Sequence, residues 1–127
     1  MEGAKEILAF AKKNFLALQL QNIDTIEGNF DNTLSVVTSQ LAAINFAFID
    51  GNHRLQPTIQ YFETIVSKTD NFSIVILDDI HWSEEMEQAW EYCMNHPAVT
   101  LSIDLFFIGI LIFRKEIREK QHFVIRF

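Results

Sequence analysis

The sequence predicts an α/β fold whose sheet is mostly parallel and ends in an antiparallel C-terminal hairpin. Two apolar runs of β-branched and aromatic residues, 46–50 and 74–79, each end in aspartate, which is typical of buried strands. A helix-like segment, 57–67, lies between them, and a strand–helix–strand unit places its two strands parallel. The runs at 99–103 and 109–113 are separated by a short connection, so we expect them to be antiparallel neighbours.

The first part of the chain predicts two helices with a short strand between them. Apolar residues recur at near-helical spacing over residues 4–20, and a short apolar strand follows at residues 23–27. Asp31 or Asn32 can cap a second helix that runs to about residue 43.

The remainder of the chain alternates strands with helices. Pro57 suits the first turn of the helix after strand 46–50, because its missing N–H costs nothing there. Ser83 can cap a helix that ends at Asn95. A last strand is expected at residues 122–127, and we expect one domain over residues 1–127.

The composition restricts the classes of partner. The chain of 127 residues has a formal charge of −7, which argues against a broad nucleic-acid surface and against docking on anionic lipid. Its single cysteine fits a reducing compartment. The longest apolar run, residues 105–113, is about half of what a membrane span needs. No signal-peptide pattern is seen at the N-terminus, so a cytoplasmic location is expected.

Acidic residues and histidines follow the two predicted parallel strands. Asp50 and Asp78 end the strands, and a histidine stands three residues after each, at His53 and His81. Parallel strands bring these residues to one edge of the sheet, where α/β folds bind ligands. Each histidine is either a general base or a hydrogen-bonding surface residue.

Two further readings of this edge stay open. With Asp79, the two strand-end acids form a candidate Mg²⁺ site, although aspartate at strand ends also caps turns. Trp82 either stacks on a flat ligand or packs against the following helix. No glycine-rich phosphate loop, zinc-type cluster or nucleophile elbow is found in the sequence.

The assembled motifs resemble the class I S-adenosylmethionine-dependent methyltransferases. In that family FxFIDGNHR follows the fourth strand and VILDDIHW follows the fifth, as residues 46–54 and 75–82 do here. The similarity continues through three dipeptides, Pro57-Thr58, Tyr61-Phe62 and Ala89-Trp90. It then includes IDLFFxG at residues 103–109 and QHF at residues 121–123. It covers nearly the whole chain, and it implies a truncated Rossmann-like three-layer sandwich.

The resemblance also implies site residues and cofactors. S-adenosylmethionine would be held by Glu2 at its ribose hydroxyls, by the loop Gly28, Asn29 and Phe30 near its adenine, and by Asp50 at its reactive end. In the catechol-type relatives, acids at the positions of Asp50, Asp78 and the following residue hold Mg²⁺. Those relatives usually have asparagine where this chain has Asp79.

The family's first strand and glycine-rich loop would lie before Met1, so this chain resembles the C-terminal two-thirds of such an enzyme. In the family the sheet order is three, two, one, four, five, seven, six. Without strands one and two, strand 46–50 has an open apolar edge, which invites pairing. We expect either residues 23–27 or a second copy of the chain to pair there.

Two hypotheses of function follow. The first is a methyltransferase acting on a small-molecule acceptor, with Asp50 or His53 taking a proton where the acceptor requires it. The second is a non-catalytic remnant of the fold that binds a partner or forms homo-oligomers. Neither hypothesis expects nucleic acid or membrane as a partner.

Overall fold

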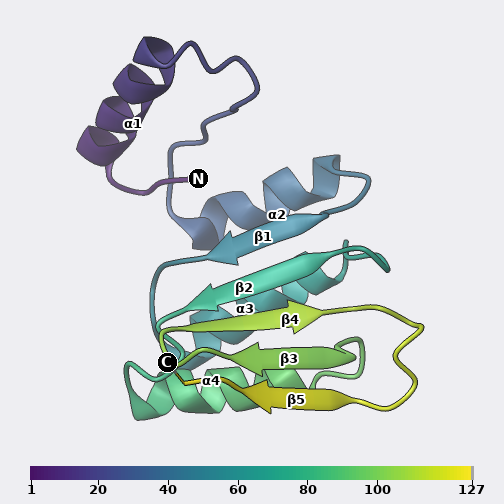
Figure 1. Ribbon diagram of the computed structural model, residues 1–127. Coiled ribbons are helices and arrows are strands. Elements are labelled where there is room, and N and C mark those ends of the chain that lie inside the picture. Colours follow the sequence, from purple (N-terminus) through teal and green to yellow (C-terminus); the bar gives the residue numbers. More distant parts are fainter. Residues whose placement is uncertain (127) are drawn as a thin grey trace. The chain divides into compact units, whose positions relative to one another are not determined.

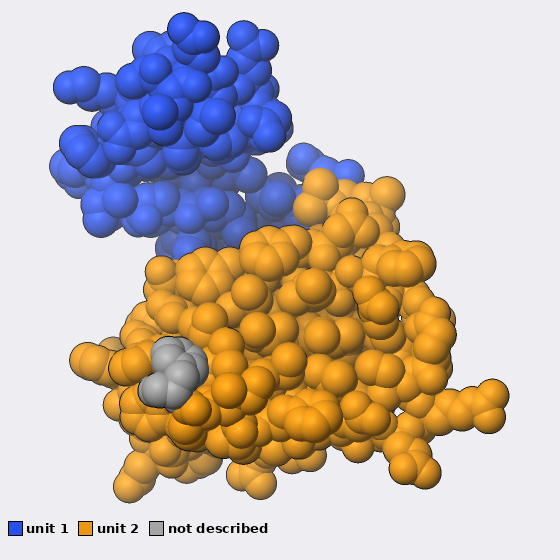
Figure 2. Space-filling model, in the orientation of Figure 1, with its two compact units in different colours: residues 1–40 blue, residues 41–127 orange. Residues whose placement is uncertain are grey.

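The computed structural model describes residues 1–126, which form four helices and five strands (Figure 1). The helices are α1 (Lys5–Ala17), α2 (Phe30–Gln40), α3 (Leu55–Val66) and α4 (Glu84–Asn95). The strands are β1 (Phe46–Ile49), β2 (Ile74–Asp78), β3 (Leu101–Asp104), β4 (Ile108–Ile112) and β5 (Gln121–Val124). The chain divides into two compact units, residues 1–40 and residue 41 onward (Figure 2). The prediction of a single domain stays a prediction.

Unit 1 contains α1 and α2. The predicted strand at residues 23–27 is wrong: its backbone is irregular, and only Glu27 makes an isolated parallel bridge, with Glu2. A strand needs a neighbour along its length, and the segment around Glu2 provides one bridge. The predicted cap of α2 is also wrong, because the helix begins earlier, at Phe30. Asn29 Oδ1 accepts the backbone N–H of Asp31 at 3.1 Å, which is an N-cap contact.

Unit 2 is built on one five-stranded sheet in the order β1-β2-β4-β3-β5. β1 and β2 are parallel, with Ile49 opposite Leu77 at their carboxyl ends. β4 is antiparallel to both of its neighbours, and β5 is parallel to β3. Four strands therefore point the same way, and the hairpin of β3 and β4 supplies the antiparallel strand. This confirms the predicted fold class. The order β1-β2-β4-β3 agrees with the four, five, seven, six part of the family's sheet.

The two faces of this sheet are packed differently. In Figure 1, α3 and α4 lie behind the sheet, and the strand residues on that face, such as Val75, Leu77 and Leu111, are buried. Gly109 lies on the same face, where an added Cβ would come within 2.4 Å of the Trp90 ring. Glycine thus lets α4 approach the sheet. The alternate residues form the other face, which is apolar and more exposed, most of all at Phe46 and Phe48.

The helices of unit 2 begin where local chemistry favours them. Ser83 caps α4 as predicted, because its hydroxyl accepts the backbone N–H of Met86 at 3.3 Å. Pro57 lies in the first turn of α3. Both helices start at the carboxyl end of the preceding strand, so the loops that join them lie at the edge where β1 and β2 end.

Candidate active site

The carboxyl ends of β1, β2, β3 and β5 lie at one edge of the unit 2 sheet, which we call the rim. The residues that follow β1, β2 and β3 lie there, and each loop contains a non-glycine residue with positive φ. These are Asn52 (63°), Asp79 (54°) and Phe106 (75°). Such backbone conformations are unfavourable for most L-residues and cluster at functional sites. The rim is therefore the first place to look for chemistry.

At the end of β1, a histidine lies among carboxylates. His53 Nε2 is 3.6 Å from Asp50 Oδ1 and 3.9 Å from Asp79 Oδ2. Both distances exceed an ordinary hydrogen bond, so the imidazole is near two acids without being fixed by either. Asn52, between them in sequence, donates from Nδ2 to the Tyr61 hydroxyl at 3.0 Å. The sequence-predicted proximity of Asp50, His53 and Asp79 is confirmed.

The predicted metal site does not fit the structure. Burial raises the pKa of the Asp78 carboxyl, and repulsion from Asp50 and Asp79 raises it further. The three acids are therefore close enough to repel one another. However, no group of acid, histidine or cysteine side chains within residues 1–126 is arranged to hold a metal ion. The structure gives the Mg²⁺ prediction no support.

At the end of β2, His81 is fixed on both sides. Its Nε2 lies 2.8 Å from Asp104 Oδ2, and its Nδ1 lies 3.2 Å from Glu87 Oε1. Burial alone would lower the pKa of His81, but the hydrogen bonds to Asp104 and Glu87 raise it. Each ring nitrogen faces a carboxylate, so neither points into open space. Of the two interpretations of His81, these contacts favour the hydrogen-bonding residue over the general base.

Sequence reasoning missed Asp104 and Arg126. The Asp104 carboxylate is buried. It accepts hydrogen bonds from the Phe106 backbone N–H at 2.8 Å and from Arg126 Nη1 at 2.9 Å. Burial would raise its pKa, but Arg126 and His81 together lower the pKa to about 2. One signal was present in the sequence: Asp104 ends a third apolar strand, as Asp50 and Asp78 end theirs.

A small pocket of about 170 Å³ opens at the rim beside these groups. Its lining residues are Asp79, His81, Trp82, Phe106 and Phe107. Trp82 is 73% exposed, so it is not packed against the following helix. The alternative in which Trp82 packs against the following helix is therefore wrong, and the alternative in which it stacks on a flat ligand stays a prediction.

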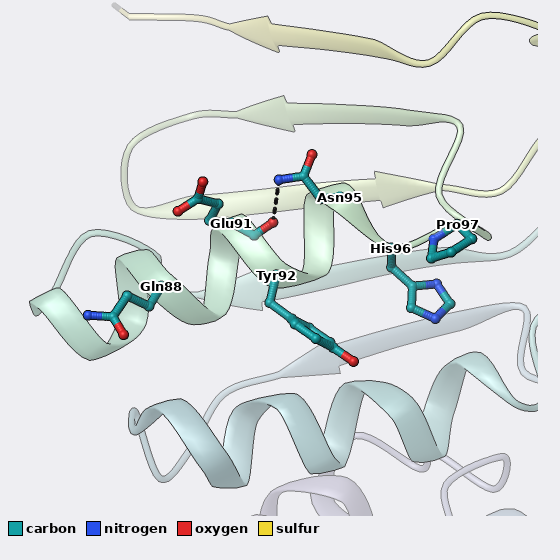
Figure 3. A pocket seen from close by; sticks show the side chains of 6 residues that line it. All are labelled: Gln88, Glu91, Tyr92, Asn95, His96 and Pro97. Carbon is teal, nitrogen blue, oxygen red and sulfur yellow. Dashed lines mark hydrogen bonds between the residues drawn. The ribbon is translucent and has the colours of Figure 1, made fainter.

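A larger hollow of about 390 Å³ lies near the end of α4, lined by Gln88, Glu91, Tyr92, Asn95, His96 and Pro97 (Figure 3). Its side chains diverge: Tyr92 and His96 point to one side of the helix, while Glu91 and Asn95 point to the other. Tyr92 donates to Glu63 Oε1 at 2.9 Å, and Glu63 also lies 3.5 Å from His96 Nε2. These polar groups contact α3 rather than converge on a space, so this is a surface hollow.

The predicted cofactor residues Glu2, Gly28, Asn29 and Phe30 all lie in unit 1. Backbone hydrogen bonds join Glu2 to Ile26 and Gly28, each at 3.0 Å, so Glu2 and the Gly28 loop lie side by side. The Glu2 carboxylate accepts the Ala4 N–H at 2.7 Å, which fixes its position at the start of α1.

Gly28 shows why this loop needs glycine. Its φ is +140°, and an added Cβ would come within 2.7 Å of Thr33 Cγ2. The glycine therefore lets this loop pack against Thr33 at the start of α2, beside the fixed Glu2 carboxylate. The cofactor roles of Glu2, Gly28, Asn29 and Phe30 stay predictions.

The fold, with polar groups at the carboxyl ends of its parallel strands, is the one that the resemblance to methyltransferases implies. A family model described as "Methyltransferase domain" matches residues 2–80, which is more than half of the chain. The chain belongs to this family, and the resemblance drawn from its motifs is confirmed.

A solved structure shares the fold. The crystal structure of an SAH-bound methyltransferase from Podospora anserina superposes with a TM-score of 0.72 at 13% sequence identity. The match covers 91% of this chain and 59% of that one, so this chain spans 59% of the length of that methyltransferase. No curated protein matches the sequence. Among residues 1–126, no helix is long and apolar enough to cross a membrane.

Proposed function

We propose that the protein takes part in S-adenosylmethionine-dependent methyl transfer to a small-molecule acceptor. The observation that carries this proposal is the parallel pairing of β1 and β2, which places His53 beside both Asp50 and Asp79 in a methyltransferase-family fold. Ligand sites of open α/β sheets lie at this edge.

In unit 1, the proposed cofactor contacts are the Glu2 carboxylate, which accepts ribose hydroxyls, and the backbone of Gly28, Asn29 and Phe30, which lies against the adenine. When bound, S-adenosylmethionine supplies an electrophilic methyl group on a sulfonium. Glu2 fits its role because its other contact, from Ala4 N–H, fixes the carboxylate in advance.

At the rim, the protein's own groups orient the acceptor and take its proton. His53 is the proposed base, because its Nε2 is not fixed by a short hydrogen bond. Asp50 lies 3.6 Å from the imidazole and supplies a negative charge beside it. Positioning of acceptor and methyl donor supplies the rest of the rate enhancement.

A second candidate function is favoured by one observation at the sheet edge. β1 is the terminal strand of the five-stranded sheet, and its Phe46 and Phe48 side chains are 62% and 52% exposed. Residues 23–27 form no strand, so the alternative in which they pair with β1 is not realised. We propose that β1 pairs with β1 of a second copy, which would suit a non-catalytic binding module as well as an enzyme.

Titration calorimetry with S-adenosylmethionine tests the first candidate. We expect saturable binding, weakened about 10- to 100-fold in Glu2→Gln, because a hydrogen bond to a charged acceptor is lost. Glu6→Gln, an exposed carboxylate on the same unit, is the matched control. A folded chain that gives no heat at millimolar ligand excludes cofactor binding by this polypeptide.

Size-exclusion chromatography tests the second candidate. We expect a dimer that Phe48→Lys converts to monomer, since the added charge opposes edge pairing. The exposed Phe72, which lies outside β1, gives the control variant Phe72→Lys. A wild-type chain that elutes as a monomer at all concentrations contradicts the dimer.

A further inference from the structure

We infer that the rim pocket binds a positively charged organic group, such as an alkylammonium, carried by the methyl acceptor. The inference rests on the proposed function for the identity of the ligand as the acceptor, whereas the binding itself follows from the pocket. Three kinds of observation support it: the open aromatic surfaces, the charge around them and the size of the space.

The open aromatic surfaces come from Trp82 and Phe107. Their side chains are 73% and 66% exposed, yet they line one pocket together with Phe106. Large aromatic side chains gathered in the open at a functional edge mark an interaction site. The face of an aromatic ring attracts cations through its quadrupole, and indole does so best.

Phe106 already shows this behaviour inside the protein. The Arg126 guanidinium carbon lies 5.5 Å from the centre of the Phe106 ring, and the His81 ring stacks on it with centroids 5.5 Å apart. Phe106 thus lines the pocket with the Arg126 guanidinium and the His81 ring beside it. Trp82 and Phe107 remain to face a ligand.

The charge near the pocket is negative. The carboxylates of the rim are Asp50, Asp78, Asp79, Glu87 and Asp104. Arg126 and the His81 ring each contact Asp104, and Arg54 follows β1 at the same edge, so the basic groups are fewer than the carboxylates. Asp79 and His81 both line the pocket, and repulsion from Asp50 and Asp79 raises the pKa of Asp78. An anionic ligand would be repelled, and a cation would relieve the repulsion.

The space admits a head group rather than a large ligand. About 170 Å³ is below the roughly 300–1,000 Å³ of pockets that enclose drug-sized molecules. Its walls are held in place, because Asp79 and Phe106 have fixed positive-φ backbones and Asp104 accepts the Phe106 N–H. A preformed wall lowers the ordering cost of binding a small cation.

The inference is tested by comparing the binding of choline with that of its uncharged carbon isostere. In the isostere, a tert-butyl group replaces the trimethylammonium group. Binding is followed by the NMR signals of the two indole N–H groups, with buried Trp90 as internal reference and Trp82→Phe for assignment. We expect choline to shift the Trp82 signal saturably, and the isostere to bind about tenfold more weakly. Equal binding of the two compounds, or no shift with choline, overturns the inference.

Matched variants localise the binding. Asp79→Asn removes the charge while asparagine tolerates the positive φ, and it should weaken choline binding about tenfold. Glu119→Gln removes an exposed charge outside the rim and should change nothing. Phe107→Ala should weaken binding severalfold, whereas Phe72→Ala, which truncates an equally exposed phenylalanine before β2, should not. Equal effects within either pair contradict the assignment.

Calorimetry with S-adenosylmethionine on the same samples separates the two claims. Cofactor binding without choline binding is consistent with the proposed function and contradicts the inference about the rim pocket. Choline binding without cofactor binding supports the cation site in the rim pocket. It contradicts the claim that the bound cation belongs to a methyl acceptor.

Discussion

The two strand ends at the rim share one sequence design but have different roles. Asp50 and Asp78 each precede a histidine by three residues. His53 lies 3.6 and 3.9 Å from its nearest carboxylates, whereas His81 lies 2.8 and 3.2 Å from its partners. His53 therefore makes no short contact with an acid, whereas His81 is held on both sides. The same spacing in the sequence therefore does not give the two histidines the same contacts.

The difference comes from the position of each strand in the sheet. β1 is a terminal strand with β2 as its neighbour, so few side chains reach its end. The loop after β2 is reached by Asp104 from β3 and by Glu87 from α4. Arg126, from beyond β5, then holds Asp104 in place. Partners distant in sequence decide what each histidine does.

Removing the shared partner should give the largest effect. Asp104→Ala leaves His81 and Arg126 without their carboxylate, and the free energy of unfolding should fall by about 3 kcal/mol in urea titration. Asp50→Ala, at the open strand end, should change it by less than about 0.5 kcal/mol, because that side chain is largely exposed. Equal losses in the two variants would break the contrast.

The next largest effect should be on activity alone. His53→Gln should lower methyl transfer about 100-fold while stability changes little, because the proposed role of the residue is that of a base and it makes no short hydrogen bond to either acid. The assay measures S-adenosylhomocysteine formed with an amine acceptor. The control is His96→Gln, which replaces a histidine at the C-terminal end of α4. A His53 variant that keeps full activity assigns the proton transfer elsewhere.

The pH dependence of stability sharpens the contrast further. Because the pKa of His81 is raised on folding, its stabilisation is complete below the unfolded pKa near 6.5 and is lost as the pH rises through the folded pKa. The pKa of Asp104 is lowered, so its contribution is present above the unfolded value near 3.8 and is lost as the pH falls through about 2.

We therefore expect urea titrations of the wild-type chain to show falling stability above neutral pH. In His81→Gln, this alkaline decline should flatten, while the decline in acid remains. His53→Gln should leave both limbs as they are in the wild type. If the loss of stability above neutral pH is unchanged in His81→Gln, that loss comes from the titration of another group.

The smallest effect should come from the outer partner of His81. Glu87 is 58% exposed, so Glu87→Gln should cost roughly 0.5 kcal/mol or less, and less still at high salt. A loss as large as that of Asp104→Ala would mean that the exposed carboxylate, not the buried one, fixes the ring.

Local patterns predicted most of unit 2 and the composition of the rim. The parallel pair of β1 and β2, the Ser83 cap and the β3–β4 hairpin all depend on short-range signals, and all are confirmed. The strand at residues 23–27 was wrong because a strand depends on a neighbour that local sequence does not reveal. Asp104 and Arg126 were missed for the same reason: their value lies in contacts across more than twenty positions.

Arg126 lies beyond β5, yet its Nη1 donates to the Asp104 carboxylate that also contacts His81. A substitution at Arg126 should therefore alter the surroundings of His81, although 45 positions separate the two residues in the sequence.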